Sequence, residues 1–80
     1  MEHRLKSWPE NFGPVKNGIK KAEVRLNDRQ FELGDLILLE EWSPVTRLYT
    51  GESVKIKVTH IVKDFDGLQN NYVVLSFERI

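Results

Sequence analysis

Apolar and polar residues alternate along most of this chain, and a period of two is typical of β-strands with one buried face. The alternation predicts strands at His3–Trp8, within Gly18–Asp28, at Ser53–Val62 and at Tyr72–Glu78. A fifth strand is predicted at Leu36–Trp42, where a short and nearly continuous apolar run is typical of a strand buried on both faces. Five evenly spaced strands favour a small, highly curved mixed sheet or barrel.

One short helix is predicted at Pro9–Asn17, because proline suits the first helical turn and pushes the residue before it into extended geometry. Three apolar residues recur at spacings of three and four and form a stripe for the core: Phe12, Val15 and Ile19. Pro14 removes a backbone hydrogen bond, so the helix is expected to kink or restart there. Gly18 is placed to end the helix in left-handed geometry.

The segment Gly18–Asp28 concentrates charge on one face of its predicted strand. The face expected to point into the core carries only apolar side chains: Ala22, Val24 and Leu26. The opposite face carries a cation, an anion and a cation in a row: Lys21, Glu23 and Arg25. Lys20 precedes them and Asp28 follows, so five charged side chains converge on one short segment.

The connections between these elements contain residues typical of turns. A turn is predicted at Leu33–Asp35, a hairpin loop at Ser43–Glu52 and a turn-rich connection at Lys63–Asn71. Two aromatic side chains are predicted to lie in the core, Phe31 and Trp42, the latter with its indole N–H bonded to a loop.

Length and composition exclude several classes of protein. The 80 residues make one domain, 1–80, with no room for a second core. The formal net charge is zero, which argues against coating long nucleic acid by charge alone but is compatible with a local basic cleft. Cysteine is absent and His3 and His60 lie far apart in the sequence, so neither a metal site nor another cofactor is predicted.

The residues at the start of the chain are polar, unlike those of a signal peptide. The longest apolar run, Leu36–Leu39, is far shorter than the roughly 20 residues that span a bilayer. We therefore expect a cytoplasmic protein without a membrane partner.

Several motifs follow one another along the chain. They are H-x-L-K-x-W-P from His3, G-x-K-x-x-E-V-R-x-N-D-R from Gly18, F-x-x-G-D from Phe31, E-W-x-P-x-T-x-x-Y-T-G from Glu41, and G-L from Gly67 followed by Y-V-V-L-S. This order resembles the ASCH superfamily, which has a PUA-like β-barrel, and within it the small bacterial and phage proteins called DUF3850. The resemblance covers essentially the whole chain, and only the Gly13-Pro14 pair departs from the pattern.

The resemblance implies a mainly β fold with one short helix (α+β), in the form of a PUA-like (ASCH) small β-barrel. It also implies binding of RNA in a cleft between the helix and the barrel. One branch of the superfamily resembles an amidohydrolase that acts on a modified cytidine through a lysine, a threonine and a glutamate. The lysine maps to Lys20, Glu23 stands at the threonine position, and the glutamate has no counterpart between Val62 and Tyr72. Only one of the three roles carries over.

Five residues form the candidate ligand-binding set: Lys6, Trp8, Lys20, Glu23 and Arg25. The Arg25 guanidinium matches a phosphate or carboxylate, while Glu23 either accepts from a base edge or holds Arg25 in place. Trp8 beside Lys6 suits stacking on a base next to its phosphate. The competing interpretation is a solvated strand face with weak ion pairs, and a tryptophan that closes the barrel mouth.

Three further residues are candidate supporting residues: His3, Asp28 and Arg29. His3 is either a proton shuttle or an ordinary polar strand residue. Asp28 is placed to pair with Arg25 or Arg29 and so to fix the guanidinium orientation. Two other groups are given little weight because they fit a solvated surface: His60 and the Lys55 and Lys57 stripe.

Three functions remain open on this basis. The first is binding of RNA or a nucleotide-like ligand in a cleft lined by the five candidate residues. The second is hydrolysis of a modified nucleoside with Lys20 as base or nucleophile, which needs a lysine that loses its proton easily. The third is a phage-type module that binds a protein partner. A cleft that exposes Trp8 beside Lys20 and Arg25 would favour the first.

Overall fold

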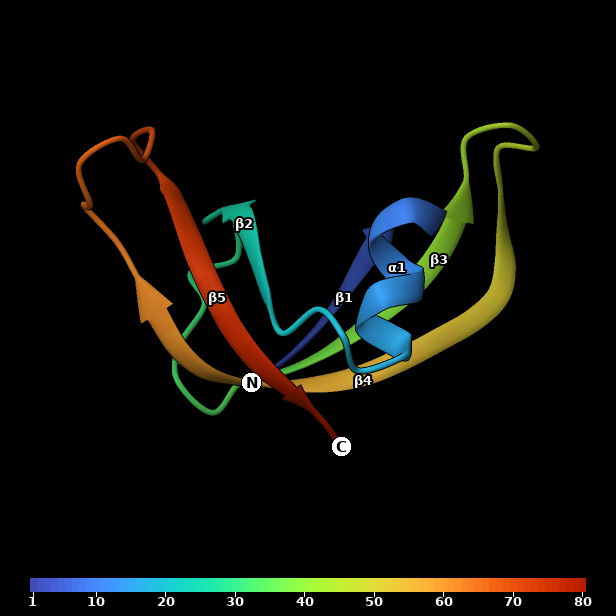
Figure 1. Ribbon diagram of the computed structural model, residues 1–80, viewed down its shortest axis with the longest axis horizontal. Coiled ribbons are helices and arrows are strands. Elements are labelled where there is room, and N and C mark those ends of the chain that lie inside the picture. Colours follow the sequence, from blue (N-terminus) through green and yellow to red (C-terminus); the bar gives the residue numbers. More distant parts are fainter.

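The structure, a computed structural model that describes residues 1–80, contains five strands and one helix (Figure 1). They are β1 (Glu2–Ser7), α1 (Pro9–Lys16), β2 (Ala22–Leu26), β3 (Leu36–Ser43), β4 (Leu48–Val62) and β5 (Tyr72–Arg79). The predicted mainly β fold with one short helix is confirmed. The helix has eight residues and is neither long nor apolar enough to cross a membrane.

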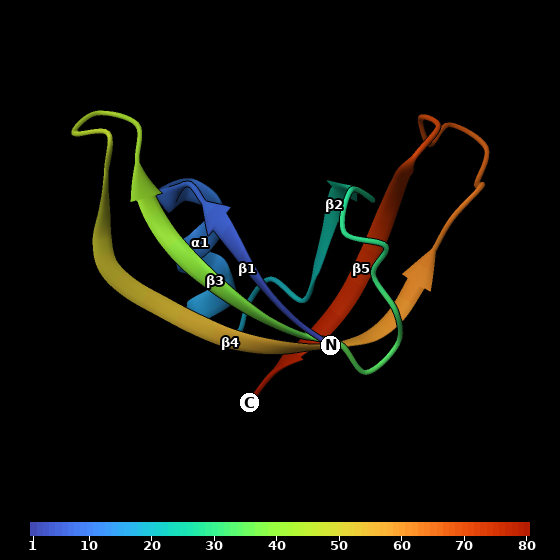
Figure 2. The same ribbon diagram turned by 180° about the vertical axis from the view of Figure 1, so that it is seen from behind.

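All five strands form one sheet in the order β1-β3-β4-β5-β2, with β1 parallel to β3 and every other pair antiparallel. The long strand β4 pairs with β3 through its first part and with β5 through its second part, and the register shifts between Val58 and His60. Figures 1 and 2 show β4 running from one arm of the curled sheet to the other. Because β1 and β2 are the two edges, the sheet is an open half-barrel with a seam between them.

The core fills the concave side of this half-barrel. Eleven buried apolar side chains form one cluster: Leu5, Phe12, Val15, Phe31, Ile37, Leu39, Ile56, Val58, Val73, Leu75 and Phe77. Every strand except β2 contributes to it, and the helix contributes two residues. The predicted inward positions of Phe31 and of the alternating residues of β5 are therefore confirmed.

The helix differs from its prediction at two positions. Ile19 is 80% exposed, because α1 ends at Lys16 and Ile19 falls in the linker that follows. Pro14 lies inside a single helix, so the expected restart is wrong. Pro14 removes one ladder hydrogen bond, and the burial of Phe12 and Val15 against the sheet stabilises the helix despite this cost. Gly18 has φ +81°, as predicted for the residue that ends the helix.

Strand β2 presents its faces the opposite way from the prediction. Its register with β5 places Glu23 opposite Leu75 and Arg25 opposite Val73, on the inner face of the sheet. Val24 is 58% exposed on the outer face. A shift of one residue would exchange the two faces, and the pairing with β5 selects the one that turns the charges inward.

Strand β3 and the hairpin after it also differ from their predictions. Only Ile37 and Leu39 of the first part of β3 are fully buried, because the helix packs on the inner face and no layer covers the outer one. Trp42 is half-buried rather than a core residue. The hairpin loop is shorter than Ser43–Glu52, since β4 begins at Leu48.

Candidate functional site

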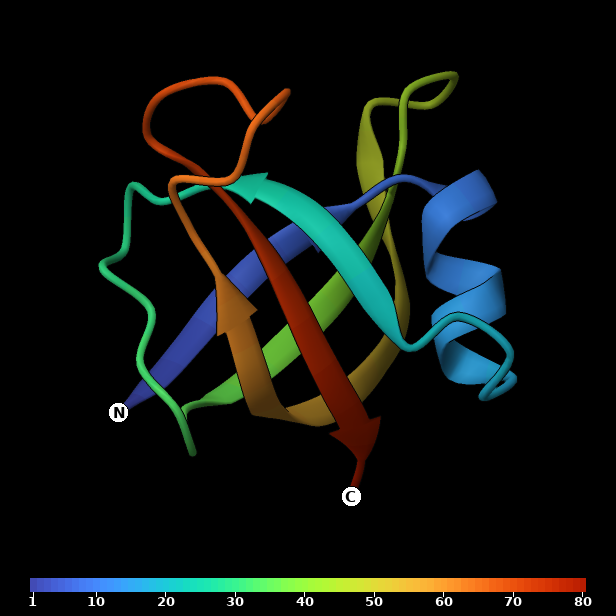
Figure 3. The same cartoon turned by 60° about the vertical axis from the view of Figure 1, so that its left-hand side comes forward.

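A cleft of about 630 Å³ lies at the open seam of the half-barrel, beside the N-terminal turn of α1. It is lined by residues of β1, α1, β2 and the adjoining segments: Lys6, Ser7, Trp8, Asn11, Lys20, Glu23, Val24 and Arg25. In Figure 3, β1 leads into the upper end of α1, and β2 begins after the linker that follows the lower end of α1. The five candidate ligand-binding residues are thus brought together, in a volume within the range of small-molecule sites.

The Glu23 carboxylate is the centre of an ion cluster in this cleft. Lys20 Nζ donates to Glu23 Oε1 at 3.1 Å, and Arg25 Nη1 donates to Glu23 Oε2 at 3.2 Å. The Glu23 side chain is 14% exposed, and those of Lys20 and Arg25 are 28% and 25% exposed. Two cations therefore share one largely buried carboxylate, and the cluster carries a surplus positive charge.

Each member of the cluster is oriented by a second contact or by its strand. Glu23 and Arg25 lie two residues apart in β2, so both point to the inner face. Arg25 Nη2 donates to the backbone oxygen of Lys6 in β1 at 3.4 Å. Lys20 Nζ also donates to Asn11 Oδ1 at 3.3 Å. Side chains of β2 and its linker thus bridge the seam that the backbone leaves open.

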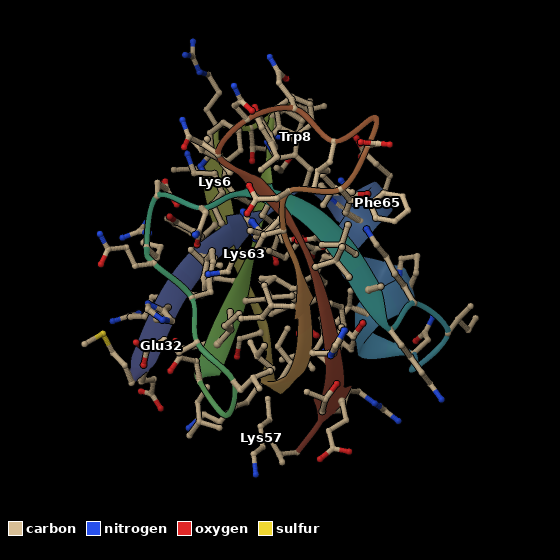
Figure 4. The ribbon with its side chains drawn as sticks, turned by 90° about the vertical axis from the view of Figure 1, so that its left-hand side faces the viewer. Lys6, Trp8, Glu32, Lys57, Lys63 and Phe65 are labelled. Carbon is tan, nitrogen blue, oxygen red and sulfur yellow. The ribbon has the colours of Figure 1, made fainter.

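Trp8 is the aromatic side chain of the cleft lining, and Trp42 lies behind it. Trp8, the residue before Pro9, has extended geometry at the start of α1 and is 46% exposed. Its ring centroid lies 6.4 Å from that of Trp42, and Lys6 Nζ lies 4.2 Å from the Trp42 centroid, a cation–π distance. Figure 4 shows Lys6 and Trp8 toward one end of the molecule and Lys57 at the opposite end.

Asn11 is a cleft residue that the sequence analysis missed. A signal for it exists, because Asn11 follows Trp8 by three residues and so lies on the same side of the first helical turn. Ser7 and Val24 were missed as well. Val24 was assigned to the core, because alternation alone does not reveal which face of β2 turns inward.

His3 lies outside the cleft, in a buried polar cluster. Its Nε2 is 2.8 Å from Asp35 Oδ2, and its ring packs edge-on against Phe31 with centroids 5.0 Å apart. Burial raises the pKa of Asp35, but hydrogen bonds from His3, the Glu32 N–H and the Met1 amino group outweigh it and lower the pKa to about 2. An ionised carboxylate only accepts, so Nε2 of His3 carries the proton.

The other two supporting candidates are also outside the cleft lining. Asp28 and Arg29 are both exposed, and Arg29 Nε lies 3.9 Å from Asp28 Oδ1. Arg25 pairs with Glu23 rather than with Asp28. Asn27 Oδ1 accepts a hydrogen bond from the Phe31 N–H at 3.0 Å, as expected for a side chain that stabilises a turn.

The lysine stripe and His60, which the sequence places on a solvated surface, lie outside the cleft. Lys55 pairs with Glu2 at 3.3 Å and lies outside the cleft lining, as do Lys57 and His60. The structure contains no group of three or more His, Asp or Glu side chains placed to hold a metal ion.

Comparison with known proteins gives a family, a relative and a fold. A family model described as a domain of unknown function, DUF3850, matches residues 2–77. An "Uncharacterized 12.9 kDa protein in GpA 3'region" of Escherichia phage P2 is 37% identical over 73 residues, which cover 91% of this chain and 64% of the phage protein. The chain therefore spans less than two thirds of the length of that relative.

One solved structure, that of the hypothetical protein PH0355, has the same fold. The two chains match over 100% of each with a TM-score of 0.67 and 22% sequence identity. This similarity extends the curled half-barrel to a protein with a largely different sequence.

Proposed function

We infer the function of this chain from two premises: it belongs to the DUF3850 family, and its open seam holds a cationic cleft beside an exposed tryptophan. We propose that the cleft binds RNA or a nucleotide-like ligand through one unpaired nucleotide. We also propose that the family belongs to the ASCH superfamily of PUA-like barrels, a kinship that the five-stranded curled sheet supports.

The observation that carries the proposal is the ion cluster around Glu23. Lys6, Lys20 and Arg25 line the cleft against the single carboxylate of Glu23, although the whole chain has no net charge. A concentration of cations in a concave site attracts an anion, because the local field depends on nearby groups rather than on the total charge. The planar guanidinium of Arg25 matches a phosphate group, which can accept two parallel hydrogen bonds from it.

Trp8 supplies the contact with the base of the proposed ligand. Trp8 is 46% exposed, and an exposed indole is a surface on which an unpaired base stacks. In the proposed complex the base lies against Trp8 while Lys20 and Arg25 face the phosphate. Glu23 orients both cations and accepts from a base edge. A neutral protein favours such a compact ligand over a long duplex.

The contacts of Lys20 favour binding over hydrolysis. Its Nζ forms an ion pair with Glu23 and donates to Asn11, whereas a nucleophilic lysine is activated by an apolar pocket or by a neighbouring cation. Lys20 is therefore assigned to charge recognition.

Isothermal titration calorimetry with the four ribonucleoside 5′-monophosphates tests the proposal. We expect saturable binding that Lys20→Ala weakens by about ten-fold or more, because a hydrogen bond to a charged group contributes roughly 1.5–3 kcal/mol. Lys57→Ala is the matched control, since this exposed lysine lies at the opposite end of the molecule. Circular dichroism verifies that each variant is folded.

The same experiment has outcomes that contradict the proposal. It is wrong if the folded wild-type protein binds none of the four nucleotides, or if Lys20→Ala and Lys57→Ala bind them equally well.

A further inference from the structure

A second hollow, of about 430 Å³, adjoins the cleft at the other side of the linker between α1 and β2. It is lined by the linker and by the end of β5: Gly18, Lys20, Lys21, Phe77, Glu78 and Arg79. Lys20 lines both hollows. The shared Lys20 makes the two hollows neighbours on the surface.

The guanidinium of Arg79 is held in place at this hollow. Its Nη1 donates to the backbone oxygen of Lys16 at 2.6 Å, at the C-terminal end of α1. A Cβ atom at Gly18 would lie 3.1 Å from Arg79 Nη2, and Gly18 has φ +81°, so glycine allows this close approach. A guanidinium has five N–H donors, and the bond to Lys16 uses one of them.

Lys21 is fixed beside Arg79 through its backbone. The Phe77 N–H donates to the Lys21 backbone oxygen at 3.0 Å, which ties the linker to β5 just before β2 begins. The Lys21 side chain is exposed and appears in no ion pair. The second hollow thus presents an oriented guanidinium and an exposed ammonium.

The linings of the two hollows carry more cations than anions. They are lined by five cations and two carboxylates: Lys6, Lys20, Lys21, Arg25, Arg79, Glu23 and Glu78. The chain as a whole is neutral, so this concentration of positive charge is local. Two adjacent cationic hollows match a ligand with successive negative charges rather than a single phosphate.

We propose that the second hollow binds the phosphate that neighbours the nucleotide in the cleft, and that the ligand is a single-stranded polynucleotide of two or more nucleotides. The inference rests on the proposed function, because it assumes that a nucleotide occupies the cleft. It adds a subsite, formed by Lys21 and Arg79, that a free mononucleotide does not reach.

Titration of the full chain with oligouridylates of one, two, four and eight nucleotides tests this subsite. We expect affinity to rise by about ten-fold or more from one nucleotide to four, since each added phosphate contact contributes to binding. We compare the affinity for the tetranucleotide with that for the mononucleotide. Lys21→Ala is expected to reduce this ratio several-fold, and Lys57→Ala to leave it unchanged. The slope of log affinity against log salt for the tetranucleotide should fall in magnitude by about 0.7 in Lys21→Ala.

A second variant and a second polymer complete the test. Arg79→Ala should reduce the same ratio, and Lys21→Ala keeps the test valid if loss of the Arg79 bond to Lys16 unfolds the protein. Oligothymidylates of equal length distinguish DNA from RNA as the source of the phosphates.

The failure of this inference is distinguishable from the failure of the proposed function. A wild-type affinity that is independent of length, or a Lys21→Ala ratio equal to that of wild type, overturns the second subsite while binding of mononucleotides stands. A folded wild-type protein that binds neither mononucleotides nor oligonucleotides overturns both.

Discussion

Two charged clusters in this small domain differ in how completely the chain satisfies them. In the first, the Asp35 carboxylate and the His3 ring are both buried, and all the donors around Asp35 belong to the chain. In the second, Glu23 is shared by Lys20 and Arg25 at a seam that opens on the cleft. The first cluster is closed and the second is open.

The difference separates stability from recognition. The buried Asp35 carboxylate accepts its hydrogen bonds from groups of the chain itself, and through His3 it joins β1 to the turn before β3. The Glu23 cluster is partly exposed and has one more cation than anion, so Lys20 and Arg25 keep N–H donors that the chain does not use. Loss of the closed cluster should therefore lower the free energy of unfolding, and loss of the open one should lower the affinity for the ligand.

Asp35→Ala is expected to have the largest effect. It leaves His3 and the Glu32 N–H without their buried acceptor, and the loss of one partner from such a cluster costs about 3 kcal/mol in the free energy of unfolding. Urea denaturation measures this loss. The control is Asp28→Ala, at an exposed aspartate, with an expected change below about 0.5 kcal/mol. Equal effects of the two substitutions would contradict the closed cluster.

A fall in pH should remove most of the stabilisation that the ionised Asp35 carboxylate gives the fold. The pKa of Asp35 is about 2 in the folded state and about 4 in an unfolded chain, so its stabilisation is complete above about pH 5 and is lost as the pH falls toward 2. The difference in unfolding free energy between wild type and Asp35→Ala should shrink by about 2 kcal/mol over this range. A difference that does not change with pH would show that Asp35 is not ionised in the fold.

Arg25→Ala should lower the affinity for the nucleotide while changing the stability of the fold little. We expect nucleotide affinity to fall by about ten-fold, which corresponds to about 1.4 kcal/mol, because the guanidinium that faces the phosphate is lost. The free energy of unfolding should change by less than about 1 kcal/mol, since Arg25 is partly exposed and its bonds lie at the seam. Calorimetric titration and urea denaturation of one protein sample give both values. If the variant unfolds, Arg25 stabilises the fold and the prediction is wrong.

Val24→Thr should have the smallest effect and tests the orientation of β2. Val24 is 58% exposed, so a hydroxyl group there changes the unfolding free energy by no more than about 0.5 kcal/mol. Val73→Thr, the same change in the core of β5, should cost about 1–3 kcal/mol because it buries a hydroxyl group. Urea denaturation that gives both substitutions the same cost would restore the original prediction that Val24 faces inward.

Sequence periodicity predicted the existence of the elements better than their orientation. It identified five strands, one helix, the buried Phe31 and the left-handed Gly18. It assigned the wrong face of β2 to the core, because alternation is symmetrical and the choice depends on pairing with β5. It also placed Ile19 in the helical stripe, although the helix ends three residues earlier.

For the candidate site, the sequence predicted which residues belong to it but not why they lie together. Residue types and motif order placed Lys6, Trp8, Lys20, Glu23 and Arg25 in one set, and the structure places all five on one cleft. The reason they meet was not visible in the sequence, because the seam exists only when β1 and β2 become the two edges of one curled sheet. The separate location of His3 likewise depends on Asp35, which is 32 residues away along the chain.

The most direct test of the central claim is a map of amide and indole NMR shifts during titration of the ¹⁵N-labelled protein with uridine 5′-monophosphate. We predict saturable shifts at the Trp8 indole and at the amides of Lys6, Lys20 and Arg25. The amides of Asp35 and Lys57 should remain unchanged. Absence of any shift, or shifts confined to residues outside the cleft, would contradict the assignment of the open seam as the binding site.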